Sequence, residues 1–232
     1  MSGALHGRVA IITGASRGIG AAISCALSGA GATVVRLART LAEHREPWGM
    51  DLPCDVTQEE QVVRCARVVA DTLGPATILV NNAGSFLLAP LAETSREAFD
   101  RQLTVNTTAP FLVARAFLPG MVAAGGGRHI LVGSVADHVA YPGNSAYAAS
   151  KFALRGLHEV LRAEFGSQGV RGTLVSPGPT DTSVWDPIDP DSRPGFIPRK
   201  DMLRPEDVAQ AVAFVATRPL HVDVDWLRLG PA

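Results

Sequence analysis

Residues 9–20 read VAIITGASRGIG, and this stretch decides the fold. Its first part, Val9–Ile12, is apolar and typical of a buried strand, and apolar residues such as Ile19 and Ile23 then recur at helical spacing. The glycines between these parts allow a tight turn, and the start of the following helix offers free N–H groups to a phosphate. This order favours a dinucleotide-binding site, and the alternative is a tight turn that holds no ligand.

Short apolar runs alternate with helical patterns along the rest of the chain. Strands are predicted at Val9–Ile12, Thr33–Leu37, Met50–Cys54, Ile78–Val80, Ile130–Val132, Thr173–Val175 and Val224–Leu229. Helices are predicted after capping boxes at Thr57 with Glu60 and at Thr94 with Glu97, over residues 146–165, and from Pro205 to Ala216. The alternation predicts an α/β fold: a doubly wound parallel sheet of about seven strands with helices on both faces.

The chain has 232 residues and shows neither a linker nor a repeat, so we expect one domain over residues 1–232, with a substrate loop at about 183–204. The net charge of −1 gives no basic field for nucleic acid or a membrane surface. Three cysteines without a CxxC pair are typical of reduced thiols, and neither a metal-ligand cluster nor a long apolar segment is present. We therefore expect a soluble, cytoplasmic protein without a bound metal.

The residues after the glycine-rich turn predict the type of dinucleotide. Proteins that bind NAD usually place an acid about 20 residues further on, where it binds the ribose 2′-hydroxyl. Here no acid stands between Gly20 and Glu43, whereas Arg39 ends the second predicted strand and Arg17 lies in the turn. Two guanidinium groups suit a 2′-phosphate, although arginines are frequent in this chain and chance placement is the alternative. The pattern favours NADP(H) over NAD(H).

A tyrosine and a lysine stand four residues apart near the start of a predicted helix. Tyr147 and Lys151 therefore share one helix face. A phenol, with a pKa near 10, is a poor acid or base at neutral pH, and a nearby ammonium lowers that pKa. The pair is thus a candidate acid–base site, the alternative being a surface cation over an aromatic ring.

Taken together, the motifs resemble those of the short-chain dehydrogenase/reductase family, most clearly from Gly7 to Thr182. The matching segments are the turn at 13–20, Asp55-Val56, Asn81–Gly84, Asn106, Ser134, Tyr147 with Lys151, and Pro177-Gly178. The resemblance implies a Rossmann-like fold and a homodimer or homotetramer formed through the helices that carry Asn106 and Tyr147.

The resemblance also implies site residues. Tyr147 would be the general acid, Ser134 would orient the carbonyl oxygen, Lys151 would bind the ribose and lower the Tyr147 pKa, and Asn106 would hold a water that relays protons. The implied cofactor-binding residues are Gly14, Ser16, Arg17, Gly18, Ile19, Gly20, Arg39, Asp55, Val56, Asn82, Ala83, Gly84, Tyr147, Lys151, Pro177, Gly178, Thr180 and Thr182.

We therefore expect an NADP(H)-dependent oxidoreductase that moves a hydride reversibly between nicotinamide and a carbonyl or alcohol. Small or medium ketones, aldehydes and 3-oxo or 3-hydroxy acids are the expected substrates, and the alternative is a non-catalytic NADP(H)-binding redox sensor. Pocket shape depends on the loops Ser85–Pro90, Ala136–Tyr141 and Asp186–Arg204, in which His138 and Trp185 are candidate lining residues.

Three local features are unusual or informative. The segment from Arg39 to Asp55 is short, so the family's helix after the second strand is expected to be stunted or absent. Gly133 stands where serine is common, and we expect little consequence of this. Pro110 lacks an N–H and cannot bond the Asn106 carbonyl, which we expect to be free for a water ligand, the alternative being a simple kink.

Overall fold

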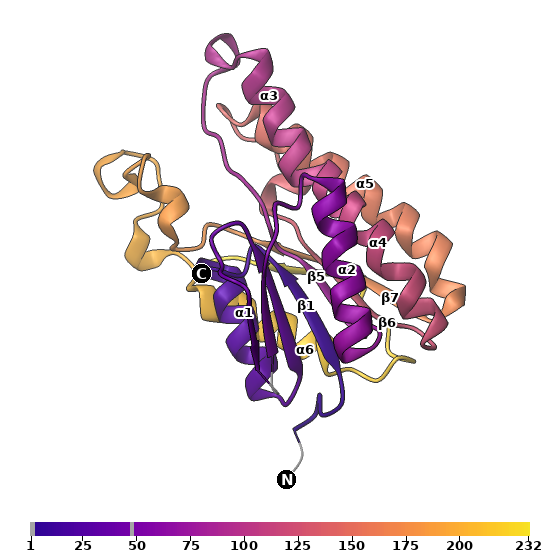
Figure 1. Ribbon diagram of the computed structural model, residues 1–232. Coiled ribbons are helices and arrows are strands. Elements are labelled where there is room, and N and C mark those ends of the chain that lie inside the picture. Colours follow the sequence, from indigo (N-terminus) through magenta and orange to yellow (C-terminus); the bar gives the residue numbers. More distant parts are fainter. Residues whose placement is uncertain (1–2, 47–48) are drawn as a thin grey trace.

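The computed structural model describes residues 3–46 and 49–232 and is built around one central sheet (Figure 1). Its strands are β1 (Val9–Thr13), β2 (Thr33–Ala38), β3 (His44–Glu46), β4 (Gly49–Pro53), β5 (Ile78–Asn81), β6 (Gly127–Val132), β7 (Val170–Pro177) and β8 (Trp226–Leu229). They lie in the order β3-β4-β2-β1-β5-β6-β7-β8. The seven predicted strands are all found. The eighth, β3, was not predicted, and it pairs antiparallel with β4 whereas the other pairs are parallel.

Helices cover both faces of this sheet, as the alternating pattern predicts (Figure 1). They are α1 (Gly18–Gly29), α2 (Glu59–Leu73), α3 (Arg96–Leu103), α4 (Ala109–Ala123), α5 (Ser145–Phe165) and α6 (Pro205–Ala216). α1 and α6 pack against one face in a core that includes Ile12, Ile23 and Val212. α2 and α4 pack against the other face in a core that includes Val62 and Leu118. None of the described helices is both long enough and apolar enough to cross a membrane.

No helix follows β2 in the described part of the segment from Arg39 to Asp55. Residues 39–43 contain a turn at Arg39 and Thr40 and no helix, and β3 then pairs antiparallel with β4 at the edge of the sheet. β4 pairs in parallel with β2 from Val34↔Gly49 to Ala38↔Pro53. In addition, Arg36 Nε donates to Asp51 Oδ1 over 2.6 Å, and a Cβ at Gly49 would lie 2.6 Å from the Val34 carbonyl oxygen. The short connection therefore continues the sheet, and the expectation of a stunted or absent helix is confirmed.

Both predicted capping boxes are wrong in detail. α2 starts at Glu59, and the Thr57 hydroxyl donates instead to Asp55 Oδ1 over 2.7 Å. α3 is capped by Ser95, whose hydroxyl accepts from the Ala98 N–H over 3.2 Å. The Thr94 hydroxyl donates to the Pro90 carbonyl, which takes it out of the capping position. In both cases a competing local hydrogen bond wins over the box.

The carboxyl ends of the central strands bring the predicted motifs together. In the strand order, β1 lies between β2 and β5. The chain therefore adds β2 and β4 on one side of β1 and then adds β5, β6 and β7 on the other side. Ligands of open α/β sheets bind at this switch point. The loops that follow β1, β5, β6 and β7 carry the glycine-rich turn, Asn82, Ser134 and Gly178, respectively.

Candidate active site

The glycine-rich turn is locked to the loop after β5. Gly14 and Gly18 have φ angles of +64° and +55°, which favour glycine. A Cβ at Gly20 would lie 2.3 Å from the Gly14 carbonyl oxygen, so α1 approaches the turn closely. The Thr13 hydroxyl accepts from the N–H of Asn82 over 3.0 Å, and the Asn82 amide donates back to the Thr13 carbonyl over 3.0 Å. These contacts hold two loops, far apart in sequence, as one rigid wall.

This wall borders a cavity of about 860 Å³, here called the glycine-turn cavity. It brings together thirteen of the predicted cofactor-binding residues: Gly14, Ser16, Arg17, Gly18, Ile19, Gly20, Arg39, Asp55, Val56, Asn82, Ala83, Gly84 and Thr182. Among the described residues, no side chain caps the N-terminus of α1, which opens on this cavity. The free helix end and the glycine cradle fit the pyrophosphate of a dinucleotide.

Charged side chains of both signs line this cavity, among them Arg17, Arg39 and Asp55. Arg17 and Arg39 both line it and are exposed. Burial disfavours the charged form of Asp55, but hydrogen bonds from Thr57 outweigh this and, with the positive charge of Arg39, hold the Asp55 pKa below its ordinary value. A carboxylate and two guanidinium groups therefore face the space beside β2.

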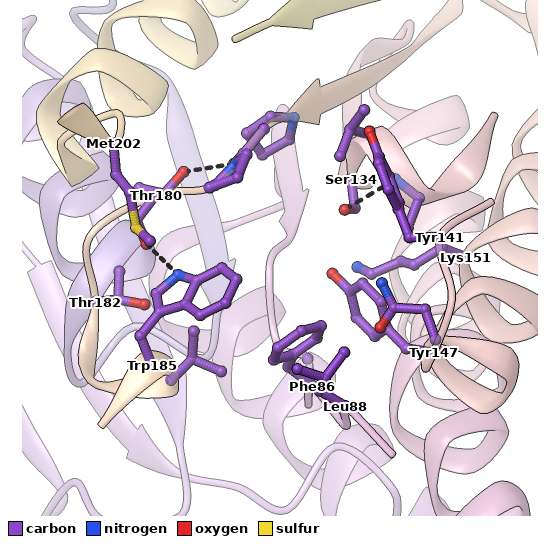
Figure 2. Close-up of a pocket in the computed structure, with 18 of the residues that line it drawn as sticks. Phe86, Leu88, Ser134, Tyr141, Tyr147, Lys151, Thr180, Thr182, Trp185 and Met202 are labelled. Carbon is purple, nitrogen blue, oxygen red and sulfur yellow. Dashed lines mark hydrogen bonds between the residues drawn. The ribbon is translucent and has the colours of Figure 1, made fainter. Parts of the chain in front are cut away.

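A second cavity of about 520 Å³, here called the Tyr147 cavity, continues from the first. It is lined by the predicted residues Ser134, Tyr147, Lys151, Pro177, Gly178 and Thr180, among others. Both cavities share Ile19, Asn82, Gly84, Ser85, Thr182 and Val184, so they form one continuous cleft. Figure 2 shows Ser134, Tyr147 and Lys151 on one side of the Tyr147 cavity, with Thr180, Thr182 and Trp185 across from them.

Burial and nearby groups set the protonation of Tyr147. Burial raises the Tyr147 pKa to about 12, a hydrogen bond with Ser134 acts in the lowering direction, and the charge of Asp137 raises it further. The Lys151 ammonium donates to the Val132 carbonyl over 3.1 Å and lies 5.7 Å from the centre of the Tyr147 ring. The Tyr147 pKa is thus raised overall, and the expected lowering by Lys151 stays a prediction.

Lys151 itself is buried, with 6% of its surface exposed. Burial lowers the Lys151 pKa to about 8, and the charge of Asp137 opposes this shift. The ammonium is thus close to its titration midpoint at mildly alkaline pH, which matters for any step that needs its charge.

A buried carboxylate that the sequence did not suggest holds Ser134 in place. Asp137 is 0% exposed, and its Oδ2 accepts from the Ser134 N–H over 3.1 Å and from the Ser176 hydroxyl over 2.6 Å. A Cβ at Gly133 would lie 2.3 Å from the same oxygen. Gly133 therefore makes room for Asp137, and the glycine itself was the available signal.

Asn106 lies behind the cleft and joins three elements. It is 1% exposed, its Oδ1 accepts from the Ser85 N–H over 2.8 Å, and its Nδ2 donates to the Ser150 hydroxyl over 2.9 Å. It stands in a turn of π-helix, Thr104–Thr108, in which the Ala109 N–H bonds the Thr104 carbonyl. Pro110 cannot make the ordinary helical bond to Asn106, which accounts for this turn. The water ligand of the Asn106 carbonyl stays a prediction.

Of the two candidate lining residues, Trp185 lies on the cavity and His138 does not. Trp185 lines the Tyr147 cavity, and its indole N–H donates to the Thr180 carbonyl over 3.1 Å. His138 instead contacts Asp137 Oδ1 through Nδ1 over 2.7 Å and packs edge-on against Trp226, outside the cavity lining. Sequence reasoning named the loops that carry Phe86 and Phe196 but missed both side chains, because their direction depends on the loop conformation.

Comparison with known proteins gives a family. Residues 8–193 match the family described as short chain dehydrogenase. D-threitol dehydrogenase of Mycolicibacterium smegmatis is 36% identical over 227 residues, which cover 92% of this chain and 87% of that protein. Glycine betaine reductase of Emericella nidulans is 33% identical over 99% of this chain, but the chain spans only 19% of that longer protein.

A solved structure gives the same result. The alcohol dehydrogenase from the archaeon Thermococcus sibiricus, complexed with 5-hydroxy-NADP, superposes with a TM-score of 0.84 at 28% identity and covers 97% of both chains. The match of sequence, sheet order and cleft leads to one conclusion. This chain belongs to the short-chain dehydrogenase family of oxidoreductases, which use nicotinamide cofactors and act on alcohol-type groups.

Proposed function

We propose that this protein transfers a hydride reversibly between NADP(H) and a carbonyl or alcohol group of a small or medium substrate. The observation that carries this proposal is the continuous cleft, which joins the glycine-rich turn to Ser134, Tyr147 and Lys151. Residues 1–232 act as one catalytic domain, and the loop at 183–204 is its substrate loop, since Val184, Trp185, Phe196 and Ile197 line the Tyr147 cavity.

Tyr147 is the general acid of the reduction. The nicotinamide supplies the hydride when it is bound. With a pKa of about 12, the Tyr147 phenol keeps its proton at neutral pH and can donate it to the carbonyl oxygen of the substrate. The Ser134 hydroxyl, fixed by Asp137 through the backbone, orients that oxygen by a hydrogen bond. In the oxidative direction Tyr147 takes the proton from the alcohol, and this direction is favoured by alkaline pH.

Lys151 and Asn106 support this proton transfer. The Lys151 ammonium would hold the ribose of the nicotinamide half by hydrogen bonds, and its positive charge near the Tyr147 ring would favour release of the phenol proton. Asn106 positions the loop after β5 against α5 and, through its carbonyl, binds a water that leads protons away from Lys151. A Cβ at Gly84 would lie 3.2 Å from Asn106 Oδ1 and 3.9 Å from Lys151 Nζ, so both groups border the same point of the cleft.

The preference for NADP(H) rests on Arg17 and Arg39. Both line the glycine-turn cavity, and Arg39 directly follows β2. Guanidinium groups bind a phosphate through paired hydrogen bonds, which a ribose hydroxyl does not reproduce. The structural relative from Thermococcus sibiricus, in complex with 5-hydroxy-NADP, supports the same choice.

Cofactor titration tests this proposal. The affinities for NADPH and NADH are measured by cofactor fluorescence for the wild type, Arg39→Ala and, as a control, Arg45→Ala, an exposed arginine on β3 outside the cavity lining. We expect the wild type and the control to prefer NADPH at least tenfold, about 1.4 kcal/mol, and Arg39→Ala to lose this preference. Failure of the wild type to bind either cofactor would overturn the proposal.

A second measurement separates the enzyme from a redox sensor. NADPH oxidation is followed with a panel of ketones and aldehydes for the wild type and Tyr147→Phe. Turnover that is lost in Tyr147→Phe, at unchanged NADPH affinity, supports the enzyme. Tight NADPH binding with no turnover of any substrate in either protein would favour the sensor.

A further inference from the structure

We propose that the substrate of the Tyr147 cavity is an uncharged carbonyl compound that carries an aromatic or bulky aliphatic group, rather than a carboxylate or a polyol. This inference rests on the proposed function, because it takes the Tyr147 cavity as the substrate site. It goes beyond it in excluding the oxo and hydroxy acids that the sequence leaves open.

A row of aromatic rings leads away from the candidate catalytic phenol. The Phe86 ring packs edge-on against Tyr147, with ring centres 4.8 Å apart at 86°. Trp185 lies against Phe86 at 5.2 Å, and Phe196 lies against Trp185 at 6.5 Å. All of these rings line the Tyr147 cavity (Figure 2 labels the first three). A flat apolar group bound in this cavity would therefore contact aromatic ring surface, with which it can pack favourably.

Several further side chains that line the Tyr147 cavity are apolar, beside polar ones such as Asn144 and Thr180. The apolar ones come from the loop after β5, from the region before α5, and from the substrate loop: Leu88, Pro142, Val184, Ile197 and Met202. An apolar site of this kind gains affinity by removing apolar ligand surface from water. A polyol, with a hydroxyl on each carbon, would instead leave hydroxyls unpaired against these side chains.

Charge gives the strongest argument against an acid substrate. Among the described residues that line the Tyr147 cavity, Lys151 is the one with a charged side chain. Its ammonium donates to the Val132 carbonyl, and we assign it to the ribose. The substrate loop carries Arg199, whose guanidinium pairs with Asp181 over 3.0 Å and also with Asp186. Arg193 and Lys200 of the same loop are exposed and lie outside the cavity lining. A carboxylate in the cavity would thus lose its water without gaining a cation.

Two buried polar atoms remain for the substrate, Ser85 Oγ and Asn144 Oδ1, since both residues line the cavity and neither atom has a hydrogen-bond partner within the described part of the chain. Asn144 as a whole is 8% exposed. A buried acceptor without a partner favours a ligand that brings one donor to it. The site therefore accepts one or two hydrogen-bonding groups on the substrate beside its apolar group, but it offers no free cation to pair with a full negative charge.

A matched pair of ketones tests the inference. 4-Phenylbutan-2-one and 4-oxopentanoate share a methyl ketone and a two-carbon spacer, and they differ in a phenyl ring against a carboxylate. We expect kcat/KM with NADPH to be at least thirtyfold higher for the phenyl ketone. D-threitol and glycine betaine, taken from the names of the two relatives, serve as polar and charged comparison compounds.

Binding is measured apart from turnover, so that this inference and the proposed function can fail separately. Titration calorimetry of Tyr147→Phe with NADPH present gives the affinity for each ketone. Tighter binding of the phenyl ketone without any turnover in the wild type would support the cavity chemistry and contradict the proposed function. Equal or tighter binding of 4-oxopentanoate, or of D-threitol, would overturn the inference whatever the turnover.

Variants of the cavity lining sharpen the test. Trp185→Ala is expected to raise KM for the phenyl ketone about tenfold, and Trp185→Phe, which keeps a ring, at most threefold, both with unchanged NADPH affinity.

Since Trp185→Ala also removes the bond to Thr180, a second variant adds charge instead. Ile197→Arg, at a 38% exposed position on the cavity lining, is expected to bring 4-oxopentanoate binding to at least tenfold above wild type. Unchanged ligand preference in both Trp185→Ala and Ile197→Arg would contradict the inference.

Discussion

At the scale of single residues, Gly133 and Asp137 depend on each other. Gly133→Ser would place a Cβ 2.3 Å from Asp137 Oδ2, so the buried carboxylate must move and loosen its bonds to Ser134 and Ser176. We expect this substitution to cost about 2 kcal/mol of unfolding free energy. Asp137→Gly, which removes the carboxylate, should make serine at 133 tolerable.

A double-mutant cycle measures this dependence. Urea unfolding of Gly133→Ser, Asp137→Gly and the double variant should give a favourable coupling energy of at least about 1 kcal/mol. Additive costs would mean that the carboxylate adapts to the side chain at 133 without strain. The sequence alone suggested little consequence of Gly133, because the partner that needs its space is visible only when the turn after β6 is folded.

The titration of Lys151 predicts the pH dependence of reduction. Its pKa of about 8 implies that the ammonium is present below pH 7 and is lost as pH rises through 8. Ketone reduction should therefore be constant below pH 7 and fall above 8, whereas loss of the Tyr147 proton, with a pKa of about 12, comes much later. Initial rates at saturating NADPH between pH 6 and 10 give this profile.

Lys151→Arg is the control for this assignment, because arginine keeps its charge throughout that range. It should be slower but should lack the fall above pH 8. The same shift affects stability: the unfolded chain binds more protons between pH 8 and the ordinary lysine pKa of 10.5, so this group's contribution to the unfolding free energy rises over that window. A fall retained in Lys151→Arg would assign the titration to another group.

At the scale of elements, Ser95 starts α3, which extends away from the sheet in Figure 1. Ser95→Ala removes the bond from the Ala98 N–H, and we expect it to cost about 1 kcal/mol. Thr94→Ala, one residue earlier, should cost a few tenths, since its exposed hydroxyl bonds only the Pro90 carbonyl. Unfolding curves and hydrogen exchange of α3 distinguish the two. A larger effect of Thr94→Ala would restore the capping box predicted from sequence.

Most helices and strands were predictable from the sequence, and each error in their prediction has a local cause. Apolar runs such as Ile130–Val132 mark strands because both faces of a parallel sheet are buried. β3, His44–Glu46, carries polar and charged residues at an edge, so periodicity contains no signal for it. At Pro110 the sequence predicts an interruption of the helix, but it does not predict the π-helical turn Thr104–Thr108 that precedes the proline. The motif residues of the site could be placed because each follows a strand, whereas Asp137, Phe86 and Phe196 depend on loop geometry.

At the scale of the whole molecule, the outer face of α4 and α5 is unusually apolar. Phe111 on α4 is 41% exposed, and Phe152 and Val160 on α5 are 45% and 52% exposed. Figure 1 shows the two helices side by side on the same outer layer. Exposed apolar side chains on one face are typical of an interface, which agrees with the homodimer or homotetramer that we propose through these helices.

Charge substitution on this face tests the assembly. Phe152→Arg and Val160→Arg in one chain would appear twice across a two-fold axis, so like charges would meet and the dimer should dissociate. Val63→Arg is the matched control, since Val63 is 43% exposed on α2, outside the proposed interface.

Light scattering after gel filtration, at several protein concentrations, should give a dimer or tetramer for the wild type and the control, and smaller species for the double variant. A wild type that stays monomeric at all concentrations would contradict the assembly, and a double variant that keeps the wild-type mass would place the interface elsewhere. Because α5 also carries Tyr147 and Lys151, dissociation is expected to lower activity along with mass, and loss of activity at unchanged mass would instead indicate local damage to α5.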